Sequence, residues 1–195
     1  MVEGLVKLSF HGPFGLCGQH RRMLFEDPIR TEAGIYLWTF QTDAGILIEY
    51  VGETGESFEK RMKEHMIQTF GGNYRVLDPA LVRRLEVKVV WNGLWRKGTR
   101  DKIGEFASRY LDLAPLIHSY LENIEVFVGV LAVDRRTRQR IEGALANHLR
   151  AEPFPASIFL PNDVRYIQRR DNELPFSLVL DCSEKIVGLP RSLVA

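Results

Sequence analysis

Five side chains of this 195-residue chain could act together on a phosphodiester bond: Tyr36, Tyr50, Arg61, His65 and Glu142. A phenol or an imidazole can take a proton from water, and a guanidinium can grip a phosphate through two N–H groups at once. A single carboxylate suits a hard divalent cation such as Mg²⁺ or Mn²⁺, which needs few carboxylates and keeps several waters. Together these groups would supply the base, the positive charge and the metal that phosphodiester hydrolysis requires.

A predicted β-hairpin and the helix after it carry the first four of these groups. Residues 34–41 and 46–52 are rich in β-branched and aromatic types, and the polar connection between them ends in glycine, which is typical of a hairpin. Residues 57–70 have an apolar residue at every fourth position, the pattern of an amphipathic helix. Because positions four apart share a helix face, Arg61 and His65 should lie side by side at the edge of the apolar stripe.

The pairing of the hairpin strands should also bring the two tyrosines together. Strand pairing through the turn can place Tyr36 and Tyr50 on one side of the sheet. Glu142 lies far downstream, in a second amphipathic stretch over 135–151 that follows a predicted strand at 125–133. Asp134 is the expected N-cap of this second helix, as Ser57 is of the first.

The order of these motifs resembles that of the GIY-YIG nuclease family. The residues that carry the resemblance are Gly34-Ile35-Tyr36, Tyr50-Val51-Gly52, Arg61, His65 and Glu142. The resemblance covers 34–70 most closely and also 125–150, with valine at the centre of the second tripeptide where the family usually has isoleucine. It implies an α/β (α+β) fold in which helices flank a small, mostly antiparallel three-stranded sheet that carries a partly helical insertion.

The resemblance also implies roles for these residues. A tyrosine, either Tyr36 or Tyr50, would be the general base, and Arg61 would contact the scissile phosphate with His65 assisting. Glu142 alone would hold one metal ion, Mg²⁺ or Mn²⁺, unlike two-metal nucleases, which cluster several carboxylates.

Two departures from the family pattern affect the site. Many members have a lysine directly after the second tripeptide, where this chain has Glu53, so one group that could lower the pKa of a tyrosine is missing. The family often has an asparagine after the glutamate. We choose Asn162 for that role, while Asn147 and Asn172 stay open as alternatives.

The remainder of the chain is expected to form additions to one domain spanning 1–195. We predict an N-terminal extension over 1–33, an insertion over 71–123 and a β-rich C-terminal extension over 152–195. The insertion contains a strand pattern at 85–91 and a helical pattern at 102–121 that should be interrupted near Pro115. The C-terminal extension contains three short strand candidates, at 164–168, 176–182 and 185–189.

Positive charge is concentrated in two segments. Residues 83–102 hold seven basic and two acidic side chains, a net charge of +5, and residues 134–150 hold five and two, a net charge of +3. Such segregation indicates a basic face despite a total charge of only +1. We expect the first segment to contact DNA through Arg96, Lys97 and Arg100. Trp91 and Trp95 could stack on bases there or pack the insertion.

Composition bounds the class of protein. Hydrophobic residues make up 45% and charged residues 26% of the chain, as in ordinary globular domains. Two cysteines with no CxxC motif argue against a structural zinc site and fit the reducing cytoplasm. No apolar run is long enough to cross a membrane. We therefore expect a cytoplasmic protein with DNA as its partner, RNA as an open alternative, and no membrane association.

The sequence thus predicts a metal-dependent endonuclease that hydrolyses DNA phosphodiester bonds. The alternative is a catalytically inactive module that keeps the fold and binds nucleic acid without a metal. A set of 19 arginines against 7 lysines is compatible with both, because arginine is the better bidentate phosphate ligand. An enzyme that acts on another phosphate-containing substrate is the third possibility.

Overall fold

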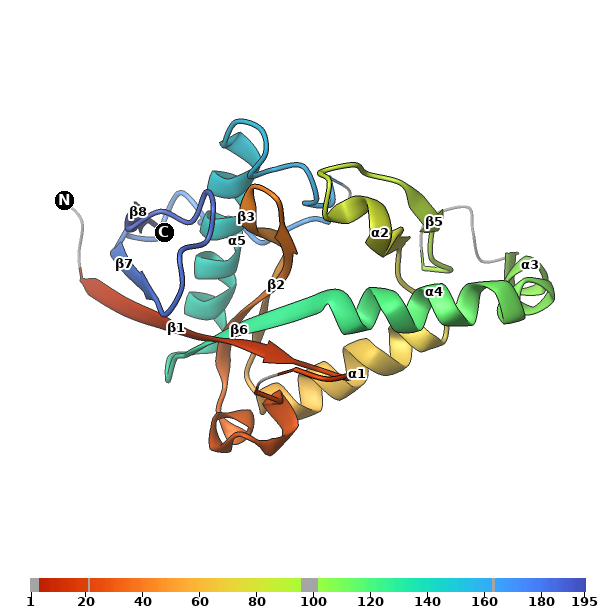
Figure 1. Ribbon diagram of the computed structural model, residues 1–195. Helices are drawn as coiled ribbons and strands as arrows, with labels where there is room; N and C mark the ends of the chain where they lie inside the picture. Colours follow the sequence, from red (N-terminus) through yellow and green to blue (C-terminus); the bar gives the residue numbers. More distant parts are fainter. Residues whose placement is uncertain (1–3, 21, 96–101, 163) are drawn as a thin grey trace.

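A computed structural model describes residues 4–20, 22–95, 102–162 and 164–195, and its centre is a six-stranded sheet (Figure 1). The strands follow the spatial order β3-β2-β6-β1-β7-β8. They span Leu5–Gly15 (β1), Gly34–Thr42 (β2), Gly45–Thr54 (β3), Ile124–Val130 (β6), Ser177–Cys182 (β7) and Ser192–Val194 (β8). Neighbouring strands are antiparallel except β1 and β7, which are parallel, so the sheet is mixed, and it is strongly curled.

The prediction of a small three-stranded sheet is wrong, because both ends of the chain add strands to it. β2, β3 and β6 are the three strands that the motifs predicted. β1 comes from the predicted N-terminal extension and pairs with both β6 and β7; its residue Phe10 lies opposite Gly129 on one side and Cys182 on the other. These partners lie far apart in the sequence, and local periodicity says nothing about such pairings.

Helices cover both faces of this sheet. α1 (Phe58–Phe70) and α4 (Tyr110–Asn123) lie alongside each other on one face, and α5 (Arg135–Ala151) covers the other (Figure 1). The N-caps are the expected ones: the Ser57 side chain accepts the N–H of Lys60 at 3.1 Å, and Asp134 accepts that of Thr137 at 3.0 Å.

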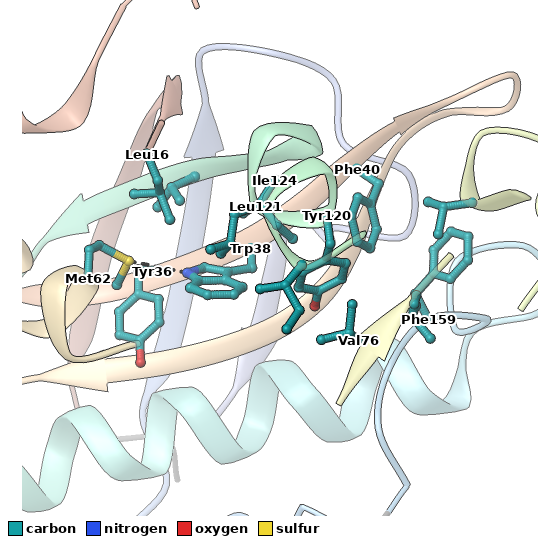
Figure 2. Packing of buried hydrophobic residues seen from close by; sticks show 14 of the residues in the cluster. Leu16, Tyr36, Trp38, Phe40, Met62, Val76, Tyr120, Leu121, Ile124 and Phe159 are labelled. Carbon is teal, nitrogen blue, oxygen red and sulfur yellow. Dashed lines mark hydrogen bonds between the residues drawn. The ribbon is translucent and has the colours of Figure 1, made fainter. Parts of the chain in front are cut away.

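Alternating residues of β2 separate two hydrophobic cores. Tyr36, Trp38 and Phe40 pack on the side of α1 and α4, whereas Ile35 and Leu37 pack on the side of α5. Figure 2 shows the three aromatic rings on one side of β2, with the Trp38 indole N–H donating to the sulfur of Met62 at 3.2 Å. This alternation decides which side chains of β2 can reach the helix that carries Arg61 and His65.

The region between α1 and β6 contains short elements. These are β4 (Val76–Leu77), α2 (Pro79–Val82), β5 (Val89–Trp91) and α3 (Ile103–Ser108), and the longer helix α4 follows them. Elsewhere, two 3₁₀ turns, η1 (Leu24–Glu26) and η2 (Pro28–Thr31), lie between β1 and β2. β4 and β5 pair as a separate two-stranded sheet.

Two expectations for this region are corrected. The strand predicted over 85–91 is confined to β5. The predicted interruption near Pro115 is also absent, because Pro115 lies within α4 and the break falls at Arg109, between α3 and α4. The predicted DNA-contacting residues Arg96, Lys97 and Arg100 lie outside the described residues.

Most arginines of α5 hold other parts of the fold. Arg136 forms two hydrogen bonds of 2.6 Å with the carboxylate of Glu173, and Arg140 donates to the carbonyl oxygens of Leu174 and Ala195. Arg150 likewise donates to the carbonyl of Val164 at 2.8 Å. The positive charge predicted over 134–150 is therefore largely used to attach the C-terminal segment, and less of it remains for a partner.

Candidate active site

The candidate site lies at the β3 edge of the sheet. Because β3 is the first strand in sheet order, groups from both faces can approach it. Tyr50 of β3 packs against the cores of both faces. Its ring centroid is 6.2 Å from that of Tyr36 on β2, so the two tyrosines lie side by side, as the hairpin led us to expect.

The hydroxyl of Tyr36 connects the strand to α1. It lies 2.6 Å from Nε2 of His65 and accepts a hydrogen bond from Nε of Arg61 at 3.2 Å. Burial, together with the positive charge of Arg61, lowers the pKa of His65 to about 3, so the imidazole is neutral at physiological pH. In the tautomer with its proton on Nδ1, His65 accepts the Tyr36 proton at Nε2. Burial raises the pKa of Tyr36 well above its ordinary value.

Gly52 makes room for this phenol. Gly52 lies opposite Tyr36 in the strand pair. A Cβ atom at Gly52 would lie 2.2 Å from Cζ and 2.3 Å from the hydroxyl oxygen of Tyr36. Only glycine therefore fits at the end of the second tripeptide while Tyr36 keeps its position.

Glu142 approaches the same edge from α5. Burial and the carboxylate of Glu53 raise the pKa of Glu142 to about 7, against a hydrogen bond from the backbone N–H of Glu53 and the charge of Arg61. Arg138, one turn before it on α5, pairs with Glu53 instead, at 2.9 Å between Nε and Oε2. Within the described ranges Glu142 forms no ion pair. A half-buried carboxyl group beside the tyrosines is therefore left without a cation that would neutralise its charge.

A cavity of about 580 Å³ opens onto the site from the α1 side. Tyr50, Arg61 and His65 line it, whereas the Tyr36 side chain beside them is fully buried. The Arg61 side chain is 35% exposed and also donates to Glu64 at 3.1 Å. A phosphate in the cavity could therefore reach the guanidinium and the Tyr50 phenol without unfolding any element.

The structure does not bring every predicted residue to this place. Asn162 is exposed in a turn, and no hydrogen bond joins it to the other five groups in the part of the chain that the structure describes. The alternative Asn147 is exposed as well, and its amide bonds to Gln168. The family resemblance had led us to expect an asparagine at the site, and among the described residues neither Asn162 nor Asn147 forms a hydrogen bond to its groups.

Two neighbours of the site were not foreseen. Tyr166, from the segment after α5, places its ring 6.4 Å from that of Tyr50, and Tyr74 places its ring 5.5 Å from that of His65. Tyr74 lies in no predicted element, and Tyr166 lies in the strand predicted over 164–168, a segment that the structure shows as irregular, so neither pattern placed these rings at the site.

The donor set fits one weakly coordinated hard cation rather than a metal cluster. Among the described residues there is no group of three or more His, Cys, Asp or Glu side chains placed so that they could hold a metal ion together. One carboxylate, Glu142, that is raised in pKa and unpaired suits Mg²⁺ or Mn²⁺, whose other ligands are water and substrate oxygens.

Comparisons of the chain with protein families, with curated proteins and with solved structures gave no match. No helix in the described ranges has the length and apolar character needed to cross a membrane. The site itself must therefore carry any functional argument.

Proposed function

We propose that the chain is a metal-dependent endonuclease that hydrolyses DNA phosphodiester bonds, with a site similar to that of GIY-YIG nucleases. The observation that carries the proposal is the Tyr36 hydroxyl, which is bonded to Arg61 and His65 and lies beside Tyr50. A buried phenol held between a cation and a neutral imidazole is arranged for proton transfer, which a purely structural tyrosine does not need.

Arg61 binds the scissile phosphate in this proposal. Its guanidinium is fixed by Tyr36 and Glu64, yet part of it faces the cavity. A fixed guanidinium loses little freedom when it meets a phosphate oxygen, and its charge stabilises the extra negative charge of the transition state.

The two tyrosines and His65 remove the proton from the attacking water. Tyr50 lines the cavity and its ring centroid lies 6.2 Å from that of Tyr36, whose hydroxyl in turn meets Nε2 of His65. As the water gives its proton to Tyr50, the Tyr50 proton passes to Tyr36 and the Tyr36 proton passes to Nε2 of His65. Phosphate bound to Arg61 neutralises one of the two causes of the low His65 pKa, so the imidazole becomes a better proton acceptor when substrate is present.

Glu142 would hold the divalent cation, which would supply positive charge for the leaving oxygen. The carboxyl of Glu142 must lose its proton to do this, and its pKa of about 7 allows the loss near neutral pH.

Plasmid nicking in Mg²⁺ or Mn²⁺ tests the proposal. Arg61→Ala and Glu142→Ala should each abolish cleavage, while circular dichroism and the melting temperature measured without metal stay near those of the wild type. Arg22→Ala, which removes an exposed arginine paired with Asp27, is the matched control and should cleave normally. Full activity in Arg61→Ala or Glu142→Ala would refute the assignment.

A further inference from the structure

The cavity extends past the catalytic groups to an aromatic wall that the proposed chemistry does not use. Tyr74 contacts the ring of His65 at 5.5 Å between centroids, and Trp95 contacts Tyr74 edge to face at 5.4 Å. Both rings line the cavity. The Trp95 side chain is 58% exposed, so most of its large apolar surface is available for a ligand to cover.

A β-bulge turns a carboxylate toward the same space. Trp38 lies opposite Tyr50 and Thr39 opposite Ile48, so Glu49 is the extra residue of β3. Consecutive residues of a regular strand point to opposite faces, yet Glu49 and Tyr50 both line the cavity. Bulges re-aim side chains in this way beside binding sites.

Glu49 is held as a fixed acceptor in the cavity wall. Its side chain is only 7% exposed, and its Oε1 accepts the hydroxyl of Tyr120 at 2.8 Å and a guanidinium N–H of Arg75 at 3.4 Å. Burial raises the pKa of Glu49, while the charge of Arg75 acts against this. Arg75 is itself anchored on the carbonyl of Phe159 at 2.9 Å. The geometry leaves the carboxylate oriented before any ligand arrives.

We infer that this part of the cavity binds one unpaired base of the DNA strand whose phosphate lies on Arg61, an inference that rests on the proposed nuclease function. Flat aromatic surfaces stack on any base, and a buried carboxylate accepts the N–H groups of a base edge. A base in a duplex can use neither contact, because both of its faces are stacked on neighbouring bases and its N–H edge is paired. A volume of about 580 Å³ is also within the range of small-ligand pockets.

Binding measurements without metal test the pocket separately from cleavage. Fluorescence anisotropy in EDTA compares a short labelled single-stranded oligonucleotide with an abasic strand of the same length. The base-bearing strand should bind about 5- to 150-fold more tightly, the range expected for one base stacked on an aromatic side chain. Trp95→Ala should remove this advantage and leave the abasic strand unaffected, whereas Trp95→Phe should retain most of it. Phe154→Ala, which truncates an exposed ring elsewhere, is the matched control.

Three outcomes would overturn the inference: equal wild-type affinity for the two strands, equal weakening of both by Trp95→Ala, or dGMP binding as tightly as the oligonucleotide. The last would assign the pocket to a free nucleotide instead. Arg61→Ala should weaken both strands equally, because it removes a backbone contact. Failure of the nuclease proposal would appear differently, as base-dependent binding in a protein that cleaves nothing in the presence of metal.

Discussion

The hydroxyl of Tyr36 and Nε2 of His65 lie 2.6 Å apart, and neither side chain exposes more than 5% of its surface. Burial of two polar groups is favourable only when they satisfy each other, so each residue fixes the position of the other. The Tyr36–His65 pair joins the first tripeptide to α1. Arg61, which lines the cavity, donates a hydrogen bond to Tyr36 and so connects the pair to the cavity. A strand and a helix are thus connected by the same bonds that the proposed chemistry uses.

If Tyr36 and His65 act as one proton-accepting unit, their substitutions should not add. Tyr36→Phe and His65→Gln should each lower the single-turnover rate of plasmid nicking by about 10²- to 10⁴-fold. The double variant should be about as slow as the slower single variant, since either change already breaks the relay. Melting temperatures measured in parallel separate this loss from unfolding. Losses that multiply in the double variant would mean that the two residues act independently.

Gly52→Ala should damage the site through Tyr36. The new methyl group would overlap the phenol, so the ring must move away from His65 and Arg61. We expect a stability loss of about 1–3 kcal/mol by denaturant unfolding and strongly reduced nicking. Gly104→Ala in α3 is the matched control, because its Cβ meets nothing within 4 Å. It should leave activity unchanged and stability equal or slightly higher. Normal nicking by Gly52→Ala would show that the Tyr36 position is not needed.

Local patterns predicted the part of the fold that carries the site. The β2–β3 hairpin, α1 and α5 each have a periodic or capped sequence, and their residues meet as the spacing led us to expect. Strand partners are different, because a pairing such as Phe10 with Cys182 depends on the whole chain and leaves no local trace. The sheet was therefore predicted with too few strands.

The same limit applies to the site. Tyr36, Tyr50, Arg61 and His65 lie within one short stretch, so their convergence follows from one hairpin and one helix. Glu49 lines the cavity only because of a bulge, which adds one residue to β3 and follows no composition rule. Tyr166 and Trp95 reach the site from irregular segments, where side-chain direction depends on tertiary packing.

Metal binding should stabilise the folded chain through Glu142. A cation that binds only the folded state raises its stability by about 2.7 kcal/mol at a hundred times its dissociation constant. Mg²⁺ or Mn²⁺ should therefore raise the melting temperature of the wild type but not of Glu142→Ala. Differential scanning fluorimetry measures this shift relative to metal-free buffer that contains EDTA. An inactive nucleic-acid-binding module needs no metal, so equal shifts or none in both proteins would favour that alternative.

The pKa of Glu142 gives a pH-dependent stability of known sign in the absence of metal. The carboxyl titrates near 4.5 in the unfolded chain and at about 7 in the folded one, so between these values only the folded state keeps the proton. The free energy of unfolding should therefore fall as pH rises through this window, by at most about 3 kcal/mol. His65 acts in the opposite direction, because its folded pKa of about 3 lies below 6.5 and its contribution grows as pH rises toward that value.

The wild-type curve alone mixes these two groups, so the measurement is the difference between wild type and Glu142→Gln. Both proteins contain His65, and glutamine keeps the shape of the side chain without its titration. Urea unfolding in EDTA at several pH values should show the two stabilities converging at low pH and Glu142→Gln becoming the more stable protein toward pH 7. Excess Mg²⁺ should reverse the order, because only the wild type gains a bound cation. A difference that does not change with pH would mean that Glu142 is solvated and is not held for a metal.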